Sequence, residues 1–516
     1  MTLTTPAGIL VQTDHGPVRG TSDGPVFVWK GIPYAAAPTG PLRFRAPQPP
    51  QPWSEPLDAS EFGPCEPQGL NAAIPLGPNV RMDEDCLSLN IWSPSGGKSK
   101  KPVMFWIHGG AYFRGASSQP LFDGRSLAEN GDVVVVTINY RIGVFGWVDF
   151  SSFSVPGRIF DSNVALKDMI AALTWVKGNI ANFGGDPDQV TVFGESAGGG
   201  AVTTLMAMPS AEGLFHRAIA ESSPATSVYN SKRAVTVAVQ YLELLGGGTE
   251  ALGQLRTAGA GELLEASDAL FNAIPASAPG TLAFAPVVDG ELLPEYPVQA
   301  FRSGRAHRIP LLIGTNKDES ALFRLMKSPL MPIDPPTINS MFAQIAKENP
   351  AQDIPDAGEL EPAYAGLSTQ KTGMGITRDF GFRMPTVWIV EGHSRYAPTW
   401  LYRFDYAPPA LKALGIGATH ATELAYVWGN IANKLKDVTY KLGGLRTARK
   451  VSARMQHRWL AFATAGEPEG LPGEPQWVAY DAVSRTSLVI DARDVVAQDL
   501  DAALRAAWGE DVVAFS

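Results

Sequence analysis

Short runs of apolar residues, bounded by glycine, proline and polar residues, recur along the chain and predict buried β-strands. Longer stretches with apolar residues at helical spacing predict helices between them. Because the two kinds of element alternate, we expect an α/β fold with a large, mostly parallel central sheet that helices flank. The predicted strands span residues 87–92, 103–107, 133–139, 190–193, 216–220 and 309–314, and the predicted helices span residues 168–182, 197–206, 233–245 and 448–464.

Residues 8–30 have a different pattern, in which apolar and polar residues alternate between glycine-containing turns. Such alternation is typical of strands with one face in solvent, so we expect a small antiparallel sheet at the amino-terminal end. Residues 31–53 are proline-rich and irregular, and residues 65–86 lack any clear period and predict a loop. Residues 328–366 are again proline-rich, and we place them at the periphery of the fold.

The domain organisation follows from what the chain lacks. A length of 516 residues would suggest about three domains. However, no stretch is rich enough in proline, serine or charge to act as a linker, and no internal repeat is visible. We therefore expect a single domain over residues 1–516.

Charge and hydropathy argue against two classes of partner. The net charge is −9 and there is no basic cluster, which disfavours nucleic acid and anionic membrane surfaces. The longest apolar runs, such as residues 133–136, are too short to cross a bilayer. Residues 1–6 contain neither the basic region nor the apolar core of a signal peptide. We therefore expect a cytoplasmic protein that does not bind membranes.

The two cysteines, Cys65 and Cys86, do not have the spacing of a metal site, and we expect neither a metal nor a cofactor. A disulfide between them would stabilise the fold by about 3 kcal/mol if loop closure dominates. Two separate buried thiols are the alternative in a reducing compartment.

One segment has the pattern of a catalytic nucleophile. The pentapeptide Gly194-Glu195-Ser196-Ala197-Gly198 lies between a predicted strand and a predicted helix. Gly-x-Ser-x-Gly in this setting is typical of a nucleophile elbow, a sharp turn that exposes the serine hydroxyl at the edge of the sheet. The glycines are needed because a side chain there would collide with the strand or the helix. We predict that Ser196 is a nucleophile.

A second pentapeptide, Gly20-Thr21-Ser22-Asp23-Gly24, fits the same pattern. It precedes another predicted strand, residues 26–29, and no helix follows it. Because Asp-Gly between extended runs is typical of a hairpin turn, we interpret Ser22 as part of a hairpin.

A serine nucleophile requires a base and an acid that orients the base, and in this fold the chain order is serine, acid, histidine. The histidines beyond residue 300 are His307, His393, His420 and His457. Position alone favours His420, in a glycine-containing loop, only slightly over His393. The acid should follow a strand, and both Asp318 and Glu319 do so. Asp318 also suits a helix N-cap, and both stay candidates.

The segment His108-Gly109-Gly110-Ala111 follows a predicted strand upstream of the elbow. Small residues at this position allow backbone amides to approach a substrate carbonyl oxygen, as in an oxyanion hole. We expect the amides of Gly110, Ala111 and Ala197 to hold the negative charge that develops during catalysis.

With these motifs in view, the chain resembles the type-B carboxylesterases, of the bacterial para-nitrobenzyl esterase kind, in the superfamily that includes the cholinesterases. The resemblance covers nearly the whole chain. Besides the elbow, it rests on Gly31-Ile32-Pro33-Tyr34-Ala35, Glu84-Asp85-Cys86-Leu87, Asn139-Tyr140-Arg141-Ile142-Gly143-Val144-Phe145-Gly146 and Asn182-Phe183-Gly184-Gly185-Asp186-Pro187. The resemblance implies an α/β-hydrolase fold.

The resemblance also implies roles for residues that position alone leaves open. It selects Glu319 as the acid and His420 as the base, the latter through a His-x-x-Glu motif whose glutamate, Glu423, has a supporting role. Ser222 is implied as a hydrogen-bond donor to the acid, although residues 221–224 lack the glycine usual in the family. The remaining implied features are an ion pair between Arg43 and Glu84 and a first disulfide loop between Cys65 and Cys86.

For substrates, the resemblance places an alcohol site in the loop of residues 66–85, which contains no aromatic residue to bind a quaternary ammonium. Its apolar residues suit an uncharged alcohol, and the family's bulky acyl-pocket residues correspond here to smaller ones. The expected pocket residues are Leu70, Ile74 and Leu76 for the alcohol, and Gly280 and Leu282 for the acyl group.

The expected function is that of a serine carboxylesterase that hydrolyses short- to medium-chain esters of uncharged alcohols through an acyl-enzyme. It would act on small molecules as a monomer or weak homodimer. Two alternatives stay open: the same residues could act mainly on carbamates, amides or lactones, or the fold could serve as a non-catalytic adhesion module. Intact Ser196 and His420 argue against the second.

Overall fold

The computed structural model describes residues 8–71, 74–77, 80–96, 100–431 and 438–516. Residues 1–6, on which the expectation about a signal peptide rests, lie outside the described part. Within the described ranges, none of the helices combines the length and the apolar character needed to span a bilayer.

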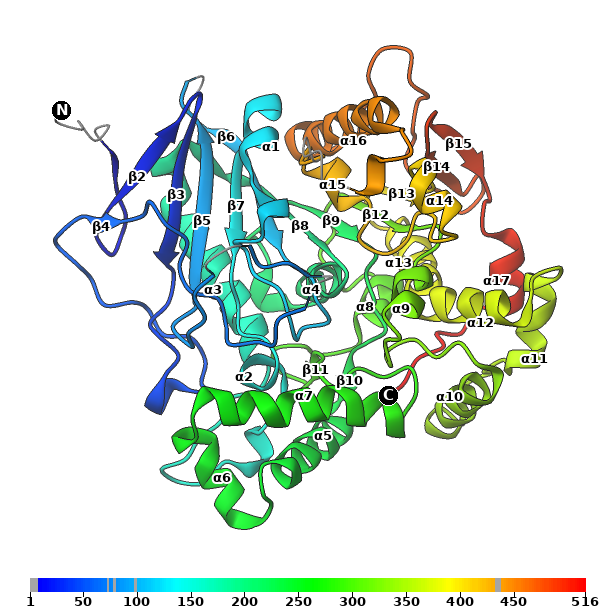
Figure 1. Ribbon diagram of the computed structural model, residues 1–516, viewed down its shortest axis with the longest axis horizontal. Helices are drawn as coiled ribbons and strands as arrows, with labels where there is room; N and C mark the ends of the chain where they lie inside the picture. Colours follow the sequence, from blue (N-terminus) through cyan, green and yellow to red (C-terminus); the bar gives the residue numbers. More distant parts are fainter. Residues whose placement is uncertain (1–7, 72–73, 78–79, 97–99, 432–437) are drawn as a thin grey trace.

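One sheet of 13 strands extends across the whole molecule, from blue amino-terminal strands at one edge to red carboxy-terminal strands at the other (Figure 1). The order is β1-β2-β3-β5-β7-β6-β8-β9-β12-β13-β14-β15, and β4 pairs with β2. The strands are β1 (Ile9–Gln12), β2 (Pro17–Asp23), β3 (Val26–Pro33), β4 (Leu57–Asp58), β5 (Ser88–Pro94), β6 (Lys101–Ile107), β7 (Val134–Ile138), β8 (Gly185–Glu195), β9 (Arg217–Glu221), β12 (Leu311–Asn316), β13 (Thr399–Phe404), β14 (Thr486–Ile490) and β15 (Val495–Gln498).

The strands from β7 to β14 in this order all pair in parallel, which confirms the mostly parallel sheet that the sequence predicts. The antiparallel strands at the amino-terminal end are also present. They do not form a sheet of their own, because β3 pairs antiparallel with β5 and so extends the central sheet. A separate parallel pair joins β10 (Tyr229–Asn230) to β11 (Val287–Val288).

Side chains of β6 alternate between two hydrophobic cores, one on each face of the sheet. Val103 and Phe105 belong to one core, and Met104 and Trp106 belong to the other. Helices contribute to the first core from α3 (Val164–Asn179), α4 (Ala197–Met206), α8 (Pro297–Ser303) and α13 (Met384–His393), and to the second from α1 (Arg125–Gly131), α15 (Leu424–Val427) and α16 (Leu445–Ala465). The helices therefore flank both faces, as predicted.

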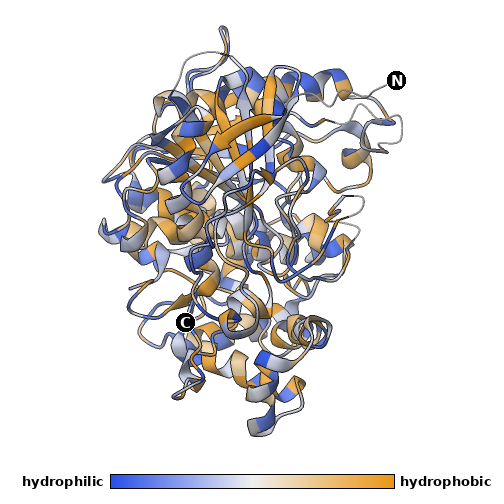
Figure 2. Ribbon diagram, turned by 90° about the vertical axis from the view of Figure 1, so that its left-hand side faces the viewer, coloured by the Kyte–Doolittle hydropathy of each residue, from blue (hydrophilic) through white to orange (hydrophobic). Residues whose placement is uncertain are grey.

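Further helices lie around these layers. Figure 1 shows α5, α6 and α7 together at one end of the molecule, and α10, α11 and α12 together at another. The strands of the sheet are largely apolar, whereas hydrophilic residues gather on the outer helices and loops (Figure 2). These helices are α2 (Val144–Trp147), α5 (Ser231–Leu244), α6 (Gly248–Thr257), α7 (Ala260–Ser277), α9 (Ser320–Leu325), α10 (Pro335–Glu348), α11 (Ala357–Leu360), α12 (Thr369–Arg378), α14 (Pro409–Ala413) and α17 (Ala502–Trp508).

Candidate active site

Strand β8 ends at Glu195 and α4 begins at Ala197, so Ser196 alone makes the turn between them. Its backbone has φ 57° and ψ −124°, angles that a residue with a side chain seldom adopts. A Cβ atom on Gly198 would lie 2.0 Å from the carbonyl oxygen of Ile107 on β6, which explains the glycine there. The tight turn presents the Ser196 side chain at the end of the parallel strands.

The other Gly-x-Ser-x-Gly segment is a hairpin, as predicted. Ser22 lies near the end of β2, where Asp23 pairs with Val26 of β3, and its side chain is exposed. Strand β3, and not a helix, follows this segment.

His420 connects Ser196 to a buried carboxylate. Its Nε2 atom lies 2.8 Å from Oγ of Ser196, and its Nδ1 atom lies 2.6 Å from Oε2 of Glu319. Because a carboxylate can only accept a hydrogen bond, Nδ1 carries the proton and Nε2 is free to accept one from the serine. The arrangement can activate a serine hydroxyl as a nucleophile.

The other candidates for base and acid are engaged elsewhere. His307 and His393 contact the backbone carbonyl oxygens of Met208 and Ile309. The carboxylate of Asp318 accepts a hydrogen bond from the amide of Ala418 rather than contacting His420.

Glu319 follows β12 and is fully buried, and its second oxygen is also satisfied. Oε1 accepts hydrogen bonds from the hydroxyl of Ser222 at 2.5 Å and from the backbone N–H of Asn316 at 2.6 Å. The Ser222 contact forms despite the missing family glycine. Asn316 was not identified from the sequence, because a backbone donor leaves no trace in the residue type.

The segment after β6 brings backbone amides close to Ser196. Gly110 and Ala111 both have positive φ, 117° and 56°, so the chain leaves the extended conformation of β6 here. In the described part of the chain, neither amide donates to a protein acceptor. Ala111 lines the same pocket as Ser196 and Ala197, the first residue of α4. These amides can bind a negative charge that forms beside Ser196.

Three further carboxyl groups lie buried near the histidine. Oε1 of Glu195 is 3.2 Å from Nε2 of His420, and Glu423 accepts a hydrogen bond from the side chain of Asn316. Burial raises the pKa of both carboxyls well above the usual range, and the neighbouring acidic residues raise both pKa values further. Burial also raises the pKa of Glu221 to about 8, although the indole N–H of Trp459 donates to it. With a pKa of about 8, the Glu221 carboxyl holds its proton at neutral pH.

The acidic residues around His420 do not make a metal site. Across the ranges that the structure describes, no group of three or more histidine, cysteine or acidic side chains is arranged to hold a metal ion.

Comparison with known proteins decides the family. The profile of the Carboxylesterase family matches residues 7–508. This chain belongs to that family. It is 38% identical over 494 residues to the para-nitrobenzyl esterase of Bacillus subtilis (strain 168), covering 95% of this chain and 96% of the relative. It is 33% identical over 509 residues to the acylcarnitine hydrolase of Rattus norvegicus, covering 92% and 86%.

A solved structure of a PNB esterase has the same fold, with a TM-score of 0.85 at 36% identity over 97% of this chain and 99% of that one. The fold is therefore the α/β-hydrolase fold, and the protein is a carboxylic ester hydrolase that acts on small ester substrates.

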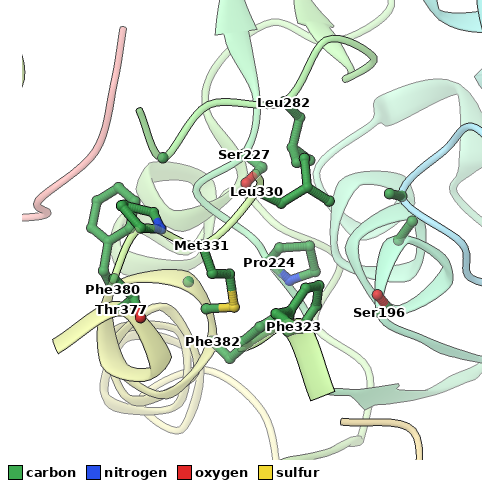
Figure 3. A pocket seen from close by; sticks show the side chains of 15 residues that line it. Ser196, Pro224, Ser227, Leu282, Phe323, Leu330, Met331, Thr377, Phe380 and Phe382 are labelled. Carbon is green, nitrogen blue, oxygen red and sulfur yellow. The ribbon is translucent and has the colours of Figure 1, made fainter. Parts of the chain in front are cut away.

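An apolar pocket of this esterase opens beside Ser196 and holds about 590 Å³ of space, its mouth included. Figure 3 shows the side chains that line it, with Ser196 at one end. No ionisable side chain is among them. The lining residues are Ala111, Ser196, Ala197, Pro224, Ser227, Gly280, Leu282, Phe323, Leu330, Met331, Pro332, Thr377, Phe380, Gly381 and Phe382.

The structure divides the residues that the sequence suggests for substrate contact. Gly280 and Leu282 line the pocket. Leu70, Ile74 and Leu76 do not: Leu70 is 79% exposed, and Leu76 packs between Cys65 and Ala116 and lines a different cleft. Their expected contact with the alcohol therefore stays a prediction.

Aromatic residues missed by the sequence analysis complete the site. The rings of Phe323 and Phe382 pack against the imidazole of His420, with centroids 5.0 and 4.7 Å away. Residues 330–332 come from the proline-rich region that was expected to be peripheral, yet they line the pocket. Isolated apolar residues in irregular segments have no period that would have revealed them.

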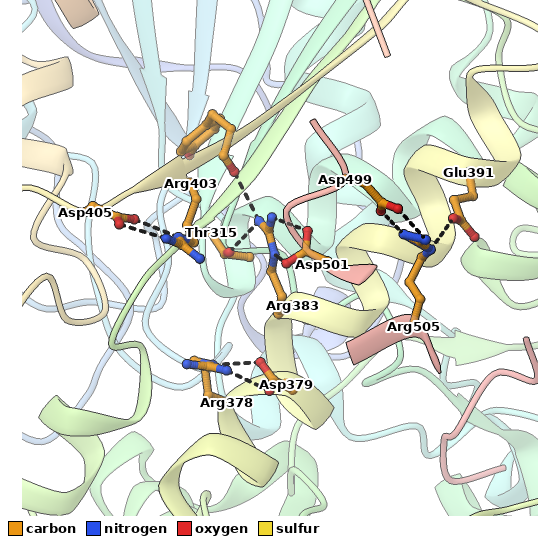
Figure 4. A network of polar contacts seen from close by, with 11 residues as sticks. Thr315, Arg378, Asp379, Arg383, Glu391, Arg403, Asp405, Asp499, Asp501 and Arg505 are labelled. Carbon is orange, nitrogen blue, oxygen red and sulfur yellow. Dashed lines mark hydrogen bonds and ion pairs between the residues drawn. The ribbon is translucent and has the colours of Figure 1, made fainter. Parts of the chain in front are cut away.

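Phe380 and Phe382 lie on a single turn of π-helix, Asp379–Arg383, between α12 and α13. Such turns are frequent at functional sites. Ion pairs hold both of its ends (Figure 4). Asp379 pairs with Arg378, and Arg383 pairs with Asp501 near the carboxy-terminal end. Arg383 also donates to the side chain of Thr315 on β12, so one network supports the pocket wall and the strand that precedes Glu319.

The implied ion pair is present, but the implied disulfide is not. Arg43 binds Glu84 with both Nε and Nη2, at 2.7 and 2.5 Å. Cys65 and Cys86 are free, buried thiols, and Cys86 donates to Glu66 at 3.2 Å. Burial raises the pKa of Cys65 to about 11 and that of Cys86 well above its usual range, so both remain protonated and unreactive.

Proposed function

We propose that Ser196 is the nucleophile of this esterase, His420 its general base and Glu319 the acid that orients the base. The observation that carries the proposal is the continuous chain of hydrogen bonds from Oγ of Ser196 through the imidazole to Oε2 of Glu319. Glu319 also accepts from Ser222 and Asn316, so its position is held from two further sides.

In the first half of the reaction, Oγ of Ser196 attacks the ester carbonyl carbon as Nε2 of His420 takes the hydroxyl proton. The carbonyl oxygen becomes an oxyanion, which the amides of Gly110, Ala111 and Ala197 stabilise. The C–O bond to the alcohol then breaks, and Nε2 gives its proton to the leaving oxygen. The products of this half are the free alcohol and an acyl-Ser196 ester.

In the second half, a water molecule takes the place of the alcohol. Nε2 accepts a proton from this water as the water oxygen attacks the acyl carbon, and the proton then passes to Oγ of Ser196. The carboxylic acid leaves and the serine is regenerated. Throughout, Glu319 keeps Nδ1 protonated and stabilises the imidazolium, while Oε1 of Glu195 lies at 3.2 Å as a second polar neighbour of Nε2.

We assign uncharged esters with short to medium acyl chains as the substrates. The pocket beside Ser196 is lined by aliphatic and phenyl side chains, and its polar side chains are only Ser196, Ser227 and Thr377. A charged group of the substrate would be desolvated in this pocket without a side chain of opposite charge to pair with, which is costly. The similarity to a para-nitrobenzyl esterase agrees with this choice. The similarity to an acylcarnitine hydrolase makes charged alcohols the case to test.

All of the proposed site residues come from this chain, so we propose that the 516 residues act as one domain and need no partner chain for catalysis. The sheet supports this organisation, since strands from β1 at Ile9 to β15 at Gln498 belong to it.

A matched substrate panel tests the proposal. Butyrylcholine and 3,3-dimethylbutyl butyrate differ only in the charge of the alcohol, and p-nitrophenyl butyrate and N-(4-nitrophenyl)butanamide differ only in the ester or amide link. We expect kcat/KM for the neutral butyrate to equal or exceed that for butyrylcholine, and the ester to react at least a hundredfold faster than the amide. A tenfold preference for butyrylcholine, or faster cleavage of the amide, would contradict the proposal.

A further inference from the structure

The pocket beside Ser196 extends from the serine toward a second group of lining residues. Figure 3 shows Ser196 at one end and Thr377 and Phe380 at the other, with Met331 on the same side of Pro224 as these two residues. Leu282 and Leu330 lie along the path between the two ends. A chain attached at Ser196 would therefore extend toward Met331 and Phe380.

The acyl group, rather than the alcohol, is the part of the ester that this space can hold. The alcohol oxygen has to lie beside Nε2 of His420 to receive its proton, and water replaces it there. His420 is not among the residues that line the pocket, because Phe323 and Phe382 pack against its ring and line the pocket themselves. The group that stays bound to Ser196, the acyl chain, therefore occupies this space.

The far end contains a glycine that faces a flexible side chain. A Cβ atom added to Gly381 would lie 3.2 Å from Cε of Met331, and no other non-neighbouring heavy atom is within 4 Å. Met331 is only partly buried and comes from the irregular segment before α10. A side chain on Gly381 would thus enter the space that the Met331 thioether borders, and the flexible methionine could move aside.

Gly280, also at the pocket, is a different kind of position. Its φ is 83°, and a Cβ atom there would lie 2.4 Å from Sδ of Met341. A substitution of Gly280 would strain the backbone and collide with the core. Gly381 has no positive φ, so it alone of these two glycines can accept a side chain while the fold is kept.

We propose that Met331 and Gly381 together set the longest acyl chain that the enzyme hydrolyses efficiently: the Met331 side chain closes the end of the pocket over the space left open by Gly381. This inference rests on the proposed serine mechanism. It assigns the chain-length limit to two residues that lie far apart in the sequence. Met331 is in an irregular segment, and Gly381 is in the π-helical turn.

The test removes the large side chain at residue 331 and adds one at residue 381, separately and together. The variants are Met331→Ala, Gly381→Leu and the combination of both, with Met326→Ala as a matched control, since Met326 is in the neighbouring segment and is 40% exposed. For each, kcat/KM is measured with p-nitrophenyl esters from acetate to laurate, and with acetates of alcohols from ethyl to octyl.

We expect Met331→Ala to move the optimum to longer acyl chains, with a gain of roughly fourfold for each additional buried methylene. Gly381→Leu should move the optimum to shorter acyl chains, and the double variant should lie near the wild type. Met326→Ala should leave the profile unchanged, and none of the variants should shift the alcohol series.

An unchanged acyl profile in both single variants, each active on acetate, would overturn the proposal. A shift in the alcohol series instead of the acyl series would also overturn it, because the pocket would then hold the alcohol. Failure of the serine mechanism is distinguishable: the wild type would then hydrolyse none of these esters, or Ser196→Ala would hydrolyse them equally well.

Discussion

Nδ1 of His420 lies 2.6 Å from Oε2 of Glu319, whereas the carboxylate of the adjacent Asp318 accepts a hydrogen bond from the amide of Ala418 at 3.1 Å. Two neighbouring acidic residues therefore have separate partners. Glu319 is positioned to fix the tautomer of the imidazole, and Asp318 holds the backbone of the loop that carries His420.

This difference predicts opposite outcomes for two conservative substitutions. Glu319→Gln should lower kcat by about 10³–10⁴, because an amide neither stabilises the imidazolium nor reliably keeps the proton on Nδ1. Asp318→Asn should change kcat less than about threefold, since the amide oxygen can still accept from Ala418. The kcat of both variants is measured by steady-state hydrolysis of p-nitrophenyl butyrate. A larger loss in Asp318→Asn than in Glu319→Gln would mean that Asp318, and not Glu319, orients the histidine.

The buried carboxyl group of Glu221 should make the stability of the fold depend on pH. Its pKa is raised to about 8 in the fold from an ordinary value of 4.5, chiefly by burial. A raised pKa means that the folded protein holds the proton more tightly, so the associated stability is complete below about pH 4.5 and is lost as the pH rises through about 8. Glu221→Gln removes this dependence while its amide oxygen can still accept from Trp459.

We therefore expect the thermal midpoint of Glu221→Gln to rise relative to that of the wild type as the pH increases from 5 to 8. The corresponding difference in the free energy of unfolding should grow by at most about 1.4 kcal/mol per pH unit. Differential scanning fluorimetry across this range measures it. A constant difference between the two proteins would mean that Glu221 ionises in the fold as it does in water.

The ion pair between Arg383 and Asp501 supports the wall of the pocket and should be important for stability. Both side chains are almost fully buried, and their closest atoms are 2.5 Å apart. Arg383→Met leaves the Asp501 carboxylate buried without its partner, which typically costs about 3–5 kcal/mol. Arg305→Met is the matched control, because the pair of Arg305 with Glu295 is exposed at the arginine and should contribute far less to stability.

Thermal unfolding of the two methionine variants tests this difference. If the thermal midpoint of Arg383→Met falls no further than that of Arg305→Met, the buried pair does not support the fold as proposed.

The sequence predicted those parts of the molecule that local pattern specifies. Apolar runs located the strands around the elbow, and the glycines of the elbow distinguished Ser196 from Ser22. Strands β13, β14 and β15 were missed, as was Phe382, because their positions follow from tertiary packing rather than from a repeating pattern. The choice of Glu319 over Asp318 required the family resemblance, since only the fold decides which carboxylate reaches the imidazole.

The pocket was the least predictable part. Leu282 is in the wall, but Leu70 points to solvent, although both were inferred from similar family arguments. Residues 330–332 meet Thr377 and residues 380–382 at the pocket only because the chain folds two distant segments together. Residue type shows that a side chain is apolar, but not which cavity it faces.

The central claim is that Ser196 forms a covalent acyl-enzyme, and covalent trapping tests it most directly. Diethyl p-nitrophenyl phosphate should phosphorylate one hydroxyl per chain and release one equivalent of p-nitrophenolate, with loss of all esterase activity. Peptide mass spectrometry should find the diethylphosphoryl group on Ser196, and Ser196→Ala should be neither labelled nor active, while Ser22→Ala should behave as wild type. A label on another residue, or an active Ser196→Ala enzyme, would contradict the account.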